Sequence, residues 1–152
     1  MKPLIVLLGS FILCHVILYW INGSTNYQLA GRVSMAIMLL FTALGHFMFV
    51  NGMARMIPDN IPYKVLIVQA TGIIEIAFAI ALLLPKYSYI AGILLIIFFL
   101  LILPANIKAS MDGLNYQTGL LDGKGLSYLW FRVPLQMLFI IWVYFSAVKD
   151  IL

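Results

Sequence analysis

Five long apolar stretches dominate this chain and restrict what it can fold into. They run over about Pro3–Ile21, Val33–Met56, Pro62–Leu84, Tyr87–Ile107 and Ser127–Val148. Each is close to the roughly 20 residues that an α-helix needs to cross the hydrocarbon core of a bilayer. Because no water is available there to satisfy backbone groups, helices are the expected form of such segments. The sequence therefore predicts an all-α membrane protein with five membrane-spanning helices.

Composition and length support one membrane domain. Of the 152 residues, 64% are hydrophobic and 9% are charged, whereas about a quarter of the residues in a soluble globular protein are charged. The length fits a single domain over residues 1–152. The net charge of +4 is small and no basic cluster occurs, which favours contact with anionic lipid over binding of nucleic acid.

The first apolar stretch, over about residues 3–21, resembles a signal peptide in having an early lysine and an apolar core. A cleavage site needs small residues, but Tyr19, Trp20 and Ile21 are large. We therefore expect this stretch to be retained as a transmembrane helix.

The distribution of lysine and arginine predicts an orientation. With five spans, six cationic residues fall on the side of the membrane that holds the N-terminus: Lys2, Arg55, Lys64, Lys108, Lys124 and Arg132. Three fall on the opposite side: Arg32, Lys86 and Lys149. Cytoplasmic loops are enriched in such residues. The sequence predicts a multi-pass protein with a cytoplasmic N-terminus.

Glu75 is an acidic residue inside an apolar run, Thr71–Pro85. It lies about 13 residues into its predicted span, or roughly 20 Å at 1.5 Å per residue, near the middle of the bilayer. Helical spacing places Thr71 and Gly72 on its side, and small residues let a neighbouring helix approach closely. We expect Glu75 to face protein, because a carboxylate in hydrocarbon needs a cation, hydrogen-bond donors or a proton.

His46 is the predicted partner of Glu75. It lies near the middle of the preceding span, with Thr42 one turn away, and a short connection makes the two spans antiparallel neighbours. An imidazole beside a carboxylate can relay a proton or hold a ligand. It can equally serve as a structural hydrogen bond between helices. The sequence leaves both interpretations open for Glu75 and His46.

A second polar group is expected nearer the cytoplasmic side. Its members are Asn51, Arg55, Gln69, Asn106, Arg132 and Gln136. The last four of these, with Thr71, are candidate ligand-binding residues. Pro104 disturbs its helix and frees backbone carbonyls, which Asn106 can meet. Arg132 is expected to extend toward the lipid headgroups. If it turned inward, it would suit an acidic or carbonyl-bearing ligand.

Metal and haem sites are not predicted. The chain has no Cys/His ligand spacing. His15, in an apolar helix, is interpreted as structural, so haem ligation by His15 and His46 is not expected. Glu75 alone lies within a span, whereas a di-iron bundle needs several inward carboxylates. The cofactor is left unknown.

Four short motifs resemble the DoxX-like group of small bacterial membrane proteins. They are Gly45-His46-Phe47 with Met56-Ile57-Pro58, then Thr71-Gly-Ile-Ile-Glu75, Leu84-Pro-Lys86, and Pro104-Ala-Asn-Ile107. The resemblance covers about residues 33–148. It implies a four-helix transmembrane bundle, with the segment at about 3–21 as an additional N-terminal helix, in a bacterial inner (plasma) membrane. His46, Glu75 and Asn106 fall where the family pattern has polar residues.

Two functions from different classes are consistent with these residues. In the first, Glu75 and His46 bind a small amphipathic molecule such as a quinone or lipid. The usual form of such a site is an apolar pocket with a few polar groups. The protein would then be a subunit of an oxidoreductase system, since no sequence feature supplies a redox centre of its own. The name of the DoxX-like family derives from an association with quinone-linked sulfur oxidation. In the second, the pair only specifies helix packing. The protein would then be a non-enzymatic scaffold, chaperone or assembly subunit that binds another membrane protein.

Overall fold

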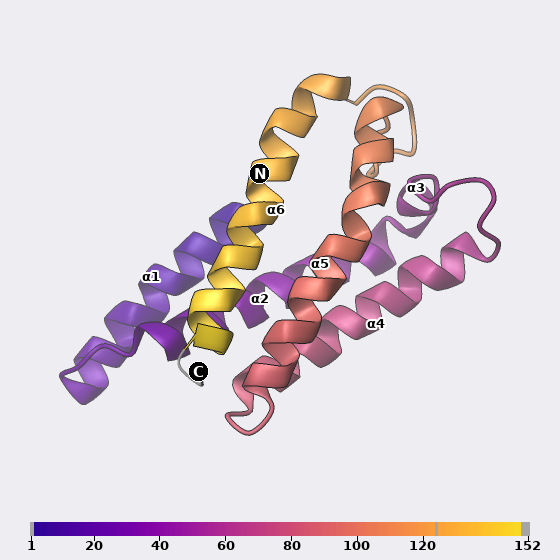
Figure 1. Ribbon diagram of the computed structural model, residues 1–152. Coiled ribbons are helices and arrows are strands. Elements are labelled where there is room, and N and C mark those ends of the chain that lie inside the picture. Colours follow the sequence, from indigo (N-terminus) through magenta and orange to yellow (C-terminus); the bar gives the residue numbers. More distant parts are fainter. Residues whose placement is uncertain (1, 124, 150–152) are drawn as a thin grey trace.

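The computed structural model describes residues 2–123 and 125–149, and this part of the chain consists of helices and loops (Figure 1). The helices are α1 (Lys2–Asn22), α2 (Tyr27–Met48), α3 (Val50–Ala54), α4 (Lys64–Leu83), α5 (Ser88–Met111) and α6 (Leu129–Val143). A 3₁₀ turn, η1 (Gly125–Tyr128), precedes α6, and a π-helical segment, η2 (Tyr144–Val148), continues it.

Five of these helical segments are long and apolar enough to cross a membrane, which confirms the predicted fold class. They are Lys2–Ile21, Tyr27–Met48, Lys64–Leu83, Ser88–Met111 and Gly125–Val148. Consecutive spans run in opposite directions (Figure 1). The α3–α4 connection and the α5–α6 loop therefore lie at one end of the bundle, and the α1–α2 and α4–α5 turns lie at the other.

Helix ends differ from the expected boundaries for local reasons. Helix α2 begins at Tyr27 because the side chain of Asn26 caps it, accepting a hydrogen bond from the Leu29 amide at 2.9 Å. At the other end, Phe49 leaves helical geometry and separates α2 from the short α3. The next expected span began at about Pro62, but α4 begins at Lys64, preceded by Tyr63 with a left-handed backbone (φ 55°).

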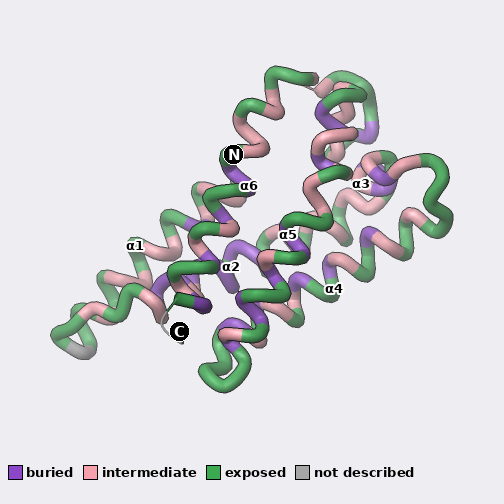
Figure 2. The backbone as a smooth tube through the Cα atoms, in the orientation of Figure 1, coloured by how far each residue is buried: buried purple, intermediate pink, exposed green. Residues whose placement is uncertain are grey.

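Buried residues occur on all five spans (Figure 2), and most of them are apolar. Met35 and Leu39 from α2, Leu82 from α4 and Leu95 from α5 are among its fully buried members. Helix α1 packs along α2 and leaves most of its surface exposed. It is joined to the core by the buried Leu7. The large exposed apolar surface of the five spans is the surface expected of a protein solvated by lipid.

The loop between α5 and α6 packs on α3 at one end of the bundle. The guanidinium of Arg55 donates a 2.6 Å hydrogen bond to the carbonyl of Gly119. Gly52 is needed for this packing, because a Cβ atom there would overlap the Tyr116 carbonyl oxygen. This contact closes the end of the bundle where α5 ends and α6 begins.

Candidate functional site

Helices α2 and α4 approach closely around Gly72. A Cβ atom on Gly72 would lie 2.9 Å from Cβ of His46 and 3.3 Å from the ring of Phe47. Real Cβ atoms essentially never come so near, so the residue at this point must be glycine or the helices must move apart. The small face predicted beside Glu75 is therefore present, and it brings the polar side chains of the two helices into contact.

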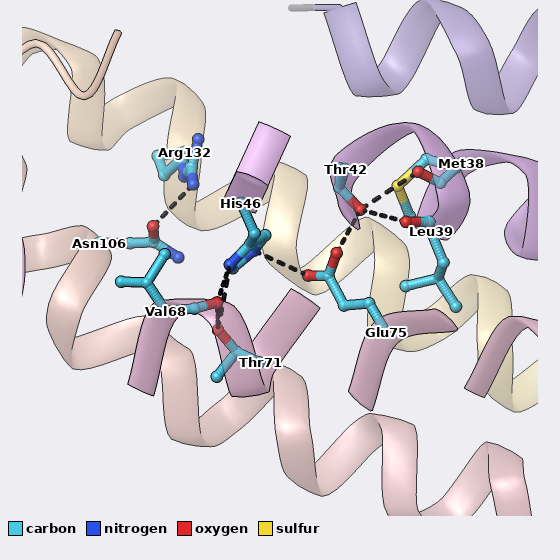
Figure 3. A network of polar contacts seen from close by, with 9 residues as sticks. All are labelled: Met38, Leu39, Thr42, His46, Val68, Thr71, Glu75, Asn106 and Arg132. Carbon is cyan, nitrogen blue, oxygen red and sulfur yellow. Dashed lines mark hydrogen bonds and ion pairs between the residues drawn. The ribbon is translucent and has the colours of Figure 1, made fainter. Parts of the chain in front are cut away.

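Glu75 lies in the middle of α4, is 4% exposed, and is held by two groups from α2 (Figure 3). The hydroxyl of Thr42 donates to Oε2 at 2.8 Å. The other carboxylate oxygen, Oε1, lies 3.4 Å from Nε2 of His46. This distance is longer than that of an ordinary hydrogen bond. The structure thus brings together the two residues that the sequence paired, across neighbouring helices.

The other ring nitrogen of His46 determines the tautomer of the imidazole. Nδ1 lies 3.0 Å from the carbonyl oxygen of Val68 and 3.0 Å from the hydroxyl of Thr71. A carbonyl oxygen can only accept, so a hydrogen bond between Nδ1 and the Val68 carbonyl requires the tautomer with a proton on Nδ1. The Thr71 hydroxyl proton is directed at the same carbonyl, 2.8 Å away, which leaves its oxygen free to accept from Nδ1.

With Nδ1 protonated, Glu75 and His46 are placed so that they can share one further proton. With Nδ1 occupied, Nε2 of a neutral imidazole presents a lone pair toward Oε1 of Glu75. Two facing lone pairs repel, and an isolated buried carboxylate is costly in an apolar interior. The contact is favourable with one proton between the two atoms, carried either by the carboxyl group or by the imidazole. The pair can therefore donate or accept a proton with little rearrangement.

The second polar group forms nearer the α5–α6 loop and involves contacts between α5 and α6. Arg132 turns inward, and its Nη2 donates to Oδ1 of the buried Asn106 at 2.6 Å (Figure 3). The expected extension of Arg132 toward the headgroups is thus replaced by a contact inside the bundle. Gln136, also buried, donates from Nε2 to the Phe99 carbonyl at 3.0 Å. Asn106 was expected to meet a carbonyl freed by Pro104, whereas its side-chain oxygen accepts from Arg132.

Gln69 and His15 lie apart from both polar groups. Gln69 is exposed on α4, whereas Val68 and Gly72 of the same helix are buried. The ring of His15 lies 4.8 Å from that of Tyr27, at the start of α2. His46 is nineteen residues further along α2, about 28 Å at the rise of an α-helix. The two histidines are thus too far apart to ligate one haem iron.

Two hollows are found in the structure, and neither is lined by Glu75 or His46. A cavity of about 30 Å³ is lined in part by Asn106 and Arg132. An apolar groove of about 290 Å³ is lined by Phe11, Tyr27, Trp142 and other residues at the opposite end of α2. The Glu75–His46 pair itself is packed closely, with 19% of the His46 side chain and 5% of the Glu75 side chain exposed.

Sequence reasoning did not assign roles to Thr42 and the Val68 carbonyl. Thr42 lies four residues before His46, so helical spacing already placed it on the same face. Its hydroxyl was a detectable candidate donor to Glu75. The Val68 carbonyl gave no signal, because every residue has one and its availability to a side chain depends on how α2 and α4 are rotated.

The fold and the site define a class: a small five-span helical membrane protein with a histidine–glutamate pair buried between two of its helices. Within this class, the chain belongs to the family described as "Domain of unknown function (DUF8561)", whose model matches residues 35–147. No curated protein and no solved structure matches the chain.

Proposed function

We propose that the Glu75–His46 pair binds the polar end of a small amphipathic molecule, such as a quinone or a lipid. The observation that carries this proposal is the 3.4 Å approach of Nε2 of His46 to Oε1 of the buried Glu75. A proton held between these two atoms would let the pair act as donor or acceptor toward a carbonyl or hydroxyl group. A ligand that enters from the bilayer would meet His46 first, because its side chain is 19% exposed and that of Glu75 is 5% exposed. Glu75 would take or give the proton and His46 would hydrogen-bond the ligand.

The physiological setting that we propose is a subunit of a quinone-linked oxidoreductase system in a bacterial plasma membrane. Support for the quinone and for this setting comes from the sequence resemblance to the DoxX-like group. The excess of lysine and arginine at the end of the bundle that holds the α5–α6 loop supports a cytoplasmic location for that end and for the N-terminus.

An alternative function, as a scaffold or assembly subunit, is favoured by a different observation. Both carboxylate oxygens of Glu75 and both ring nitrogens of His46 already contact groups of this chain. Such a satisfied network can hold α2 against α4 without any ligand. In this case the exposed apolar faces of the spans would bind another membrane protein.

Analysis of co-purified small molecules tests the proposal. The wild type, Glu75→Gln and Gln69→Ala are purified in mild detergent, and bound non-protein material is extracted and identified by mass spectrometry. We expect one amphipathic species that accompanies the wild type and the Gln69→Ala control, since Gln69 is exposed and outside the site. It should be lost from folded Glu75→Gln. The same bulk lipid in all three samples would refute ligand binding and favour the assembly function.

A further inference from the structure

Arg132 lines a small cavity at the end of the bundle where α5 ends and α6 begins. The cavity has a volume of about 30 Å³, and Asn106, Ser110, Tyr116 and Tyr128 also line it. That volume holds about one water-sized group, so it suits one or two oxygen atoms of a ligand whose remainder lies outside. The lining includes the guanidinium of Arg132, which can donate several hydrogen bonds, beside the polar side chain of Asn106.

The acidic side chains near this end are paired with other groups. Lys64 binds Asp59, and Lys108 binds Asp112. The hydrogen bond and charge of Lys64, with a smaller contribution from Lys108, hold the pKa of Asp59 below its ordinary value, so Asp59 stays ionised beside Lys64.

The remaining acid of this loop, Asp122, accepts a hydrogen bond from the Thr118 hydroxyl. Within residues 2–123 and 125–149, therefore, no carboxylate forms an ion pair with Arg132, whose side chain instead contacts the neutral amide of Asn106.

The side chain of Arg132 carries its charge into the end of the bundle. Arg132 is the fourth residue of α6, which continues the 3₁₀ turn Gly125–Tyr128, and its guanidinium is partly withdrawn from water. A guanidinium is a fixed positive charge. An anion in the cavity would compensate that charge.

We propose that this cavity binds an oxyanion, a phosphate or carboxylate group, with Arg132 as its main ligand. A guanidinium can hold two oxygens of such a group at once. The oxyanion comes either from a lipid headgroup or from a small molecule in solution. The site is separate from the Glu75–His46 pair, and the proposal does not depend on what that pair binds.

The test uses the full-length chain in nanodiscs. One sample contains phosphatidylcholine alone, and a second contains phosphatidylcholine with phosphatidylglycerol, whose headgroup carries a phosphate with a net negative charge. Native mass spectrometry measures which lipid stays on the released protein. Thermal unfolding in the first sample, with and without inorganic phosphate, measures binding of the free ion. Arg132→Gln removes the charge, and Arg32→Gln is the matched control.

Arg32 makes a suitable control because it also lacks a carboxylate partner among the described residues, bonds Ser88, and does not line the cavity. For a headgroup site, we expect the wild type and Arg32→Gln to retain phosphatidylglycerol. Arg132→Gln should retain at least about tenfold less of this lipid than the wild type. For a free oxyanion, phosphate should raise the unfolding temperature of the wild type and Arg32→Gln but not of Arg132→Gln.

Two results would overturn the proposal. One is a wild type that neither retains phosphatidylglycerol above its share of the bilayer nor responds to phosphate, a result that needs no variant. The other is an equal loss of binding in Arg132→Gln and Arg32→Gln, which would mean that only overall charge matters. Arg132→Lys, which keeps the charge but not the two-pronged geometry, replaces Arg132→Gln if that variant does not fold, and its expected retention is intermediate.

Discussion

Glu75 has a neutral isostere that can keep both of its contacts. In Glu75→Gln, the amide oxygen can accept from Thr42 and the amide nitrogen can donate to Nε2 of His46. We predict a loss of about 1 kcal/mol or less in the free energy of unfolding, within the range of one neutral hydrogen bond. Thermal or denaturant unfolding followed by circular dichroism in mild detergent measures this difference.

Glu75→Ala is expected to be more harmful than Glu75→Gln, because it leaves Nε2 of His46 without a partner in an apolar interior. The expected loss is about 1–3 kcal/mol. If the two variants were equally unstable, the hydrogen bonds assigned to Glu75 would not account for its role in the fold.

The pairing of Glu75 with His46 could be predicted from the sequence because both residues lie near the middle of long spans joined by a short connection. The direction of Arg132 could not. A long arginine side chain reaches either the headgroups or the bundle interior, and the contact with Asn106 depends on how α5 and α6 are rotated. For the same reason, the exposed position of Gln69 did not follow from its place in an apolar span.

At the scale of helices, Gly72 sets the distance between α2 and α4. We predict that Gly72→Ala lowers the free energy of unfolding by about 1–3 kcal/mol, because its methyl group would meet the Cβ atom of His46. The measurement is the unfolding midpoint of the purified protein.

Gly9 provides the control for this prediction. It lies in α1 with nothing within 4 Å of an added Cβ atom. Gly9→Ala should be neutral or stabilising by about 0.5–1 kcal/mol. Equal effects of the two substitutions would show that α2 and α4 do not approach as closely as described.

The contact between α3 and the α5–α6 loop depends on Gly52. An alanine there would place its methyl group against the Tyr116 carbonyl, so we predict that Gly52→Ala displaces the loop from α3. Hydrogen exchange of the amides in residues 112–123 should become faster, while exchange in the middle of α5 stays unchanged. Unchanged exchange in the loop would contradict this packing.

The ends of the helices were harder to predict from the sequence than their number. Hydropathy located all five, but the polar residues near Tyr27 concealed the start of α2, which extends beyond the apolar run. The left-handed backbone of Tyr63 likewise has no sequence signal, since glycine is the residue normally expected at such a position.

At the scale of the whole molecule, five spans place the α1–α2 turn and the α5–α6 loop on opposite sides of the membrane. In a Cys14→Ala background, we predict that Ser24→Cys reacts with an impermeant thiol reagent from outside intact cells. Gln117→Cys should react only after the membrane is opened, because its loop lies on the side with more lysine and arginine. Labelling of both cysteines from the same side would contradict the five-span fold.

The central claim is that Glu75 and His46 share one proton inside the membrane bundle. Nitrogen-15 NMR of labelled histidine tests it most directly, in a His15→Gln background that leaves His46 as the chain's one imidazole. We predict that Nδ1 is protonated in the folded protein, and that Glu75→Gln leaves a neutral imidazole that still carries its proton on Nδ1. A neutral His46 protonated only on Nε2 would contradict the bond to the Val68 carbonyl and, with it, the shared proton.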